Sequence, residues 1–254
     1  LDGKNTFDIK ADASIQGLAG TTSASSASTS EGVAEAFTEL VDSAGIQDVS
    51  SLIVGGELNA LGQSLNSISA DAESVVGKAI GTSKLTGKIE GLEADGISVS
   101  SDAGIQGLAQ LTNSADAATA KGASSATANI ANLQGADLDT LSVGGIASIA
   151  GQASLSNAAS SSNVDGGTSQ ALASLTDADG LEGLQSINVS SDAGLTGISG
   201  IDLTASSAST GAADSATKAI ADAVATTLQG AELGSATSIG GVGTIGGQID
   251  FNGS

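Results

Sequence analysis

Apolar and polar residues alternate in short segments that recur along the whole chain. In one such segment Ile187 and Val189 alternate with polar residues, and an inward apolar series continues through Leu195, Ile198, Ile201 and Leu203. A period of two is the pattern of a strand with one buried face. These segments therefore predict short strands, with small residues at the bends between them.

Each strand segment is followed by a tract of Ser and Ala, such as TTSASSASTS at Thr21. The tract is either a flexible linker, or a tight bend or flat strand that leads into a helix. Ser28 and Glu31 have the spacing of a helix capping box, and apolar residues at helical spacing follow. We expect five short helices, with the stripes Val33, Phe37, Leu40 and Val41; Val75, Val76, Ala79 and Ile80; Ala126, Ile130 and Leu133; Leu172 and Leu175; and Ala216, Ile220, Val224 and Leu228.

The sequence repeats with a period of about 90 residues. ISVSSDAGIQG from Ile97 returns as INVSSDAGLTG from Ile187, and FDIKADASIQG from Phe7 has the same offset. A second motif lies between these copies, as VGGELNALGQSL from Val54 and VGGIASIAGQASL from Val143. We therefore expect one elongated repeat domain over 1–254, with units of approximately 5–94, 95–184 and 185–254, each divided into halves of about 45 residues. The last unit lacks its final helix.

Periods of this length indicate stacked or solenoidal architecture. We predict a mainly β fold with short helices, namely a repeat β-solenoid or elongated stacked sheet with about one helix per 45-residue half-repeat. A β-sandwich with helices is the alternative. The small side chains imply thin layers, and the absence of Pro suits a sheet that needs every amide for pairing.

Composition excludes several classes of function. The chain has no Cys, His, Arg, Trp, Tyr, Met or Pro, and its formal net charge is -21. Nucleophilic catalysis by Ser-His or Cys-His lacks its base, so we expect no enzyme. The acidic balance disfavours nucleic acid and anionic membranes as partners, and no apolar run is long enough to span a membrane.

Only hard cations on oxygen ligands remain as metal candidates, because His and Cys are missing. Asp177, Asp179 and Glu182 in TDADGLEG form the nearest approach to a calcium loop, and Asp137 with Asp139 forms a similar pair. A solvated turn is the favoured interpretation of both, with Ca²⁺ as a non-specific bridging ion and no other cofactor. The repeated Asp12, Asp102 and Asp192 are interpreted as turn residues that bond backbone amides.

In composition and repetition the chain resembles the acidic low-complexity repeat proteins of microbial extracellular filaments, sheaths and surface layers. The resemblance implies self-assembly without catalysis. The start at Leu1 and the lack of Met indicate removal of an upstream segment such as a secretory signal. We therefore expect a secreted, extracellular or cell-surface protein.

Uncapped solenoid ends predict how such a chain assembles. We expect a structural subunit that polymerises with itself head-to-tail through its terminal strand motifs, without a nucleic-acid partner or membrane insertion. The expected interface residues are Phe7, Ile9, Ile245, Ile249 and Phe251. The alternative is a secreted monomeric β-solenoid binding module, of ice-binding or adhesin type, although regular Thr-x-Thr ladders are missing.

Overall fold

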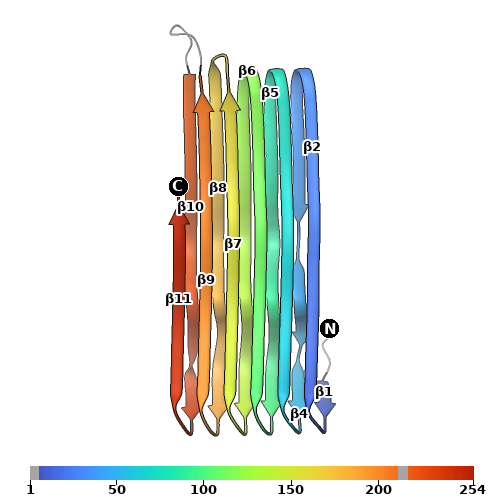
Figure 1. The fold of residues 1–254 in the computed structure, drawn as a ribbon, viewed down its shortest axis with the longest axis vertical. Helices are drawn as coiled ribbons and strands as arrows, with labels where there is room; N and C mark the ends of the chain where they lie inside the picture. Colours follow the sequence, from blue (N-terminus) through green and yellow to red (C-terminus); the bar gives the residue numbers. More distant parts are fainter. Residues whose placement is uncertain (1–5, 211–216) are drawn as a thin grey trace.

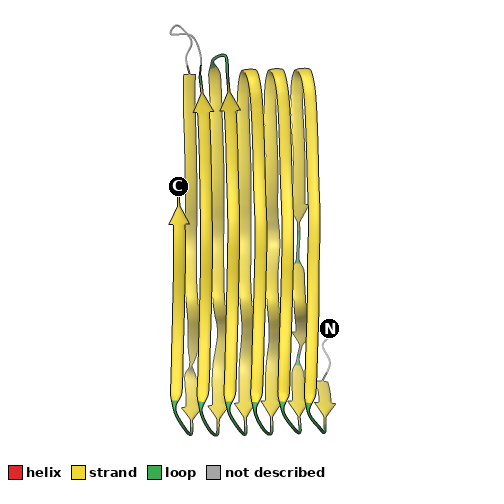
Figure 2. Cartoon of the chain, viewed as in Figure 1, coloured by secondary structure: helices red, strands yellow, loops and turns green. Residues whose placement is uncertain are grey.

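A computed structural model of the chain describes residues 6–210 and 217–254. The regular elements in these residues are all β-strands, and no helix occurs among them (Figure 2). The strands are β1 Thr6–Ile9, β2 Ala13–Leu40, β3 Ser43–Val49, β4 Ser51–Val54, β5 Leu58–Val99, β6 Ala103–Val143, β7 Ala147–Asn163, β8 Gly167–Val189, β9 Ala193–Ser209, β10 Thr217–Ile239 and β11 Gly243–Gly253.

The chain winds into a flattened parallel solenoid (Figure 1). Each coil has an ascending strand, which begins at a tight lower turn, and a descending strand, which returns from an upper bend. Ala13 lies opposite Leu58, and Leu58 lies opposite Ala103, so neighbouring coils pair in parallel at steps of 45 residues. The predicted mainly β solenoid is confirmed, and each 90-residue sequence period corresponds to two coils. The unit boundaries at 5–94, 95–184 and 185–254 remain predictions.

The prediction of helices is wrong. In the first stripe Val33, Phe37 and Val41 point outward from the descending strand, with Phe37 53% exposed, whereas Leu40 points inward. A spacing of four is also an even number, so it places side chains on one face of a strand as well as on one face of a helix. The described residues of the other four stripes lie in β5, β6, β8 and β10, and Ala216 lies outside the described residues.

Glycines bring the two sheets of each coil into backbone contact at one level, which we call the waist. A methyl group on an ascending waist glycine would overlap the carbonyl oxygen of the descending one, so only Gly permits the approach. The pairs are Gly17 with Gly45, Gly62 with Gly91, Gly107 with Gly135, Gly151 with Gly180, and Gly197 with Gly230.

The waist divides the interior into two compartments. The lower compartment, between waist and lower turns, holds Leu, Ile and Val side chains such as Leu52, Val54 and Ile97. Above the waist, Leu and Ile side chains such as Ile130 and Leu133 give way to a cluster made entirely of Ala near the upper bend. The apolar side chains of the interior therefore become smaller toward the upper bend.

Two types of lower turn alternate along the stack. In Asp turns, the carboxylate of Asp12, Asp102 or Asp192 accepts the backbone N–H of Glu57, Ile146 or Val242 in the next coil, at 2.9, 2.8 and 2.8 Å. The prediction that these aspartates bond backbone amides is confirmed, although the amide belongs to the following coil.

The receiving turns contain Gly-Gly because their backbone lies directly against the Asp turn. A methyl on Gly145 would overlap the Asp102 carboxylate, and Gly56 and Gly241 stand in the same relation to Asp12 and Asp192. An Asp turn therefore requires a Gly-Gly turn after it. This alternation gives a physical reason why the sequence repeats every 90 residues although a coil takes 45.

Candidate functional site

A band of polar side chains crosses the outer face of the descending sheet at the waist. Its central row places Glu90, Gln134, Asp179 and Gln229 opposite one another in consecutive coils. One row above contains Lys88, Asn132, Asp177 and Thr227, and one row below contains Glu93, Asp137 and Glu182, with Glu232 beside them in the next coil. We call these residues the acidic band.

Local irregularities of the strands shelter the central row. The pairing register shifts between Leu85 and Lys88 and again between Asp137 and Thr140, and Gly183 has a positive φ of 87°. Such bulges bend a strand and re-aim its side chains. As a result Glu90 is only 7% exposed and Asp179 only 1% exposed, although both are carboxylates.

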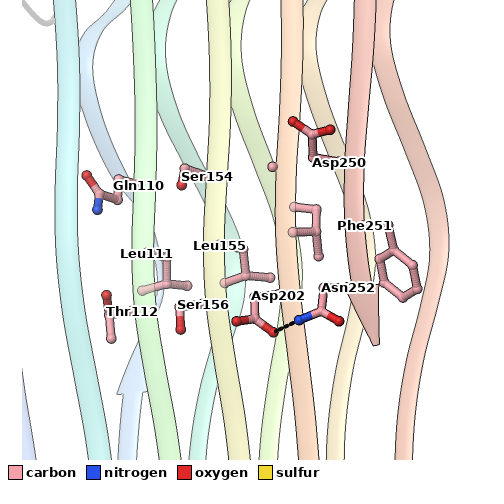
Figure 3. Close-up of a pocket in the computed structure, with 12 residues that line it drawn as sticks. Gln110, Leu111, Thr112, Ser154, Leu155, Ser156, Asp202, Asp250, Phe251 and Asn252 are labelled. Atoms are coloured by element: carbon pink, nitrogen blue, oxygen red, sulfur yellow. Dashed lines mark hydrogen bonds between the residues drawn. The ribbon is translucent and has the colours of Figure 1, made fainter. Parts of the chain in front are cut away.

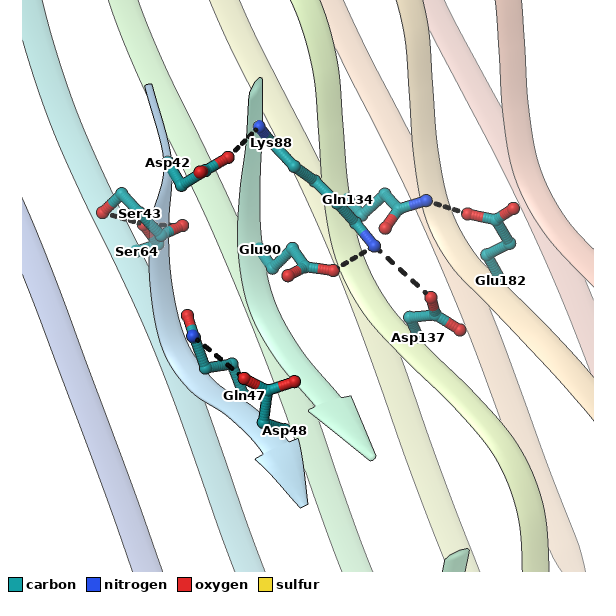
Figure 4. A network of polar contacts seen from close by, with 10 residues as sticks. All are labelled: Asp42, Ser43, Gln47, Asp48, Ser64, Lys88, Glu90, Gln134, Asp137 and Glu182. Carbon is teal, nitrogen blue, oxygen red and sulfur yellow. Dashed lines mark hydrogen bonds and ion pairs between the residues drawn. The ribbon is translucent and has the colours of Figure 1, made fainter. Parts of the chain in front are cut away.

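Lys88 compensates the charge at one end of the band (Figure 4). Its ammonium pairs with the Glu90 carboxylate and lies 3.5 Å from that of Asp137, while its backbone N–H donates to Asp42 at 2.9 Å. Burial nevertheless raises the pKa of Glu90 to about 7, because desolvation outweighs the attraction of Lys88.

The other end of the band carries Asp177, Asp179, Glu182 and Glu232. Neither carboxylate oxygen of Asp179 has a hydrogen-bond donor, and one oxygen of Asp177 also lacks one. Burial raises the pKa of Asp179 to about 7, and the negative charges of Asp177, Glu182 and Glu232 add to this effect. None of the ion pairs found in 6–210 and 217–254 reaches these four carboxylates.

The sequence candidates Asp177, Asp179 and Glu182 lie in the strand β8 and not in the expected solvated turn. Asp137 joins the band, whereas Asp139 accepts a hydrogen bond from Gln185 at 3.2 Å beside it. Within the described part of the chain, no three acidic side chains already converge in the manner of a closed metal site.

Sequence reasoning missed Glu232, Gln134 and the waist itself. The available signal is a short motif, QGADL from Gln134 and QGAEL from Gln229, in which the glycine is a waist glycine and the acid belongs to the band. The same spacing between a waist glycine and an acid two residues later occurs at Gly91 and Glu93.

A second surface feature is a shallow depression of about 510 Å³ on the ascending sheet (Figure 3). Small residues such as Ser154, Ser156 and Gly200 make room for it, and Phe251 lies at one end. Its polar groups include Asp202, which accepts a hydrogen bond from Asn252 at 3.3 Å. No lysine is among the residues that line the depression.

The expected assembly residues lie at opposite ends of the stack. Phe7 and Ile9 are half-buried in β1, which pairs with β4 and packs against the lower compartment. Ile245, Ile249 and Phe251 lie in β11, which pairs with β9, and each is about half exposed. These two groups do not meet within one chain.

No protein-family model matches the sequence, no curated protein matches it, and no solved structure matches the chain. Among the described residues, no helix of the length and hydropathy needed to cross a membrane is found. Function therefore has to follow from the chemistry of the band and of the two ends of the stack.

Proposed function

We propose that this chain is a non-catalytic structural subunit of an extracellular filament or surface layer, which polymerises head-to-tail. The observation that carries the proposal is the match between the two open ends of the stack. Within residues 6–210 and 217–254, β10 and β11 pair with strands on one side only, at an end that we call the C-terminal rim. At the other, the N-terminal rim, the same holds for β1, β2 and β3.

The internal register gives the geometry of the contact between two copies. If the stack continued, Ala13 of a second copy would lie opposite Gly243, and the pairing would extend over all of β11 to its end at Gly253. The short strand β1 would lie opposite Ala236–Ile239 of β10. Strand addition of this kind supplies main-chain hydrogen bonds from groups that are otherwise unpaired.

The alternation of turns also continues across such a contact. The last lower turn is a Gly-Gly turn at Gly240 and Gly241, and the first is the Asp turn of Asp12. Inside the stack, a Gly-Gly turn is followed by an Asp turn through the Ala147 N–H, which donates to the Asp192 carbonyl oxygen at 3.0 Å. Gly243 would donate to Asp12 of the second copy in the same way.

Apolar side chains from the interior columns reach the surface at both rims. Ile245 and Phe251 are each 49% exposed, although their counterparts Leu195 and Ile201 in the preceding coil are buried. At the N-terminal rim Phe7 and Ile15 line the lower compartment and are only partly buried. Covering these side chains would add hydrophobic stabilisation to the backbone pairing.

The polarity of the first coil indicates where two copies would make their main contact. Above the waist, the inward positions of its ascending strand include the polar residues Thr21, Ser23 and Ser25, which are half-buried at the rim. Below the waist both rims are apolar. The contact would therefore be centred on the lower compartment, where Ile15 of one copy would lie beside Ile245 of the other.

Sedimentation velocity and electron microscopy of the 254-residue chain at near-physiological salt would test the proposal. Polymers are expected because salt screens the repulsion between subunits of charge -21. Ile245→Asp should leave only monomers, since it places a charge in the apolar contact. Val75→Asp is the matched control, because Val75 is 53% exposed at the upper bend, away from both rims, and this variant should still polymerise.

A monomeric wild-type chain at every salt concentration would overturn the proposal and return the function to a binding module. Polymers of the Ile245→Asp variant that are as abundant as those of the wild type would place the contact elsewhere.

A further inference from the structure

The uncompensated end of the acidic band presents an electrostatic problem within the monomer. Parallel strands lie about 4.8 Å apart, so acidic residues at equivalent positions of successive coils are held close together. Asp137 and Glu182 are such a pair, and Glu232 follows in the next coil. Like charges in direct opposition destabilise a sheet. A buried carboxylate such as that of Asp179 adds the cost of desolvation without a hydrogen bond to offset it.

The other end of the same band shows how the protein resolves this problem with a cation. There the ammonium of Lys88 lies between the carboxylates of Glu90 and Asp137. Two coils further along, the position of Lys88 is occupied by Asp177 and that of Glu90 by Asp179. Asp177 therefore places a negative charge where Lys88 supplies a positive one, next to the buried carboxylate of Asp179. An external cation would complete the same arrangement.

We propose that Asp177, Asp179 and Glu182 bind one calcium ion at this end of the band, with Glu232 closing the site from the next coil. Asp179 is the anchoring ligand, because its two unpartnered oxygens lie at the floor of the band. Burial, together with these neighbouring charges, raises the pKa of its carboxyl to about 7, which shows the same deficit of positive charge.

Solvent reaches the site from the side of Glu182 and Glu232. A cleft of about 240 Å³ opens beside Glu182 and Glu232 and is also lined by Gly183, Gln185 and Gly234. Gln134 holds Glu182 in place from the preceding coil by donating its side-chain N–H to that carboxylate.

Calcium suits these ligands better than other common cations. It accepts six to eight oxygen ligands in irregular geometry, and water can supply those that the protein does not. Magnesium requires near-ideal octahedral geometry, which a row of carboxylates on neighbouring strands does not offer. Zinc and other transition metals prefer His and Cys, which the chain lacks.

Calorimetric titration of the purified chain with CaCl₂, together with thermal unfolding, tests the proposal independently of assembly. We expect one saturable site with a Kd of roughly 0.1–1 mM, as in extracellular calcium modules. Calcium at about one hundred times the Kd should raise the Tm by about 5–10 °C, and magnesium at equal ionic strength should raise it much less.

Asp179→Asn should abolish the saturable heat and the calcium-dependent rise in Tm, while raising the Tm of the calcium-free protein. Asp139→Asn is the matched control, since Asp139 is a nearby half-buried aspartate outside the proposed ligands, and it should retain both responses. Absence of a saturable site, or equal responses to calcium and magnesium that survive Asp179→Asn, would overturn the proposal in favour of general charge screening.

Discussion

The waist makes a sharp prediction about the three glycines of β9. Gly197 points into the coil at the waist, whereas Gly194 and Gly200 have no atom within 4 Å of an added methyl group. Gly197→Ala would place its methyl 2.5 Å from the carbonyl carbon of Gly230 and 3.0 Å from the Cα of Ala231. Both of these contacts are with backbone atoms, so a change of side-chain rotamer cannot relieve them.

The size of the effect follows from the separation that the methyl would impose. Ordinary contacts between carbon atoms are 3.5–4.0 Å, so the two sheets would have to move apart by at least about 1 Å at this level, and further to clear the Gly230 carbonyl oxygen. Overpacking against fixed structure costs about 1–3 kcal/mol, and we expect about 3 kcal/mol because both compartments lose contacts. Gly194→Ala and Gly200→Ala should instead change stability by about 0 to +1 kcal/mol, since Ala restricts the unfolded chain.

Urea and thermal unfolding followed by circular dichroism would compare the three variants. Gly197→Ala should lower the Tm by about 6–12 °C relative to the wild type, whereas the controls should match or exceed it. If all three variants had the same stability within about 0.5 kcal/mol, the two sheets would not touch at the waist and the division of the interior would be wrong.

Three further predictions concern the turns, the buried acid and the upper compartment. Asp102→Ala should cost about 1 kcal/mol in urea unfolding, because it leaves the Ile146 amide without its acceptor; an unchanged midpoint would contradict this role. The folded-state pKa of Glu90 is about 7, above its ordinary value of 4.5, so its stabilising contribution is complete below pH 4.5 and is lost as the pH rises through 7. The unfolding free energy of the wild type should therefore fall between pH 5 and 8, and Glu90→Gln should make this fall smaller by about 1–3 kcal/mol. An unaltered pH dependence would refute the assignment. Asn157→Ala should cost about 2–3 kcal/mol, because the amide of Asn157 donates to the Ala128 and Ser174 carbonyl oxygens at 3.0 and 3.1 Å; a loss below about 0.5 kcal/mol would show that these bonds are dispensable.

The solenoid could be predicted from the sequence because its signals are local and repeated. The offset that aligns Ile97 with Ile187 follows from parallel pairing, in which equivalent residues of every second coil occupy equivalent positions. Asp102 and Asp192 could be assigned to turns for the same reason. Each of these features depends on residues that are close in sequence or related by the period.

The helices were predicted wrongly because a spacing of four also suits one face of a strand, and because Ala occurs in both kinds of element. In an isolated segment, Ala at many positions favours a helix, but here Ala126, Ala128, Ala171 and Ala173 form a buried cluster between the two sheets near the upper bend. Tertiary packing overrides intrinsic propensity in such a case.

The acidic band was beyond sequence reasoning for a different reason. The burial of Asp179 depends on bulges in its own and neighbouring strands, and the sequence gives no sign of their positions. The three candidate ligands in TDADGLEG could be found from spacing alone, but Glu232 and Lys88 come from other coils. Their relation to Asp179 becomes visible only once the register is known.

The alternating turns restrict how this protein can change in length. Duplication or loss of a single coil would set two Asp turns, or two Gly-Gly turns, against each other. Two adjacent Asp turns would place residues with side chains against a carboxylate such as the one that now lies against Gly145. Two adjacent Gly-Gly turns would leave an amide such as that of Ile146 without its acceptor. Insertions and deletions are therefore tolerated in pairs of coils, so recombination among related genes, and engineered shortening or lengthening, should preserve an even count.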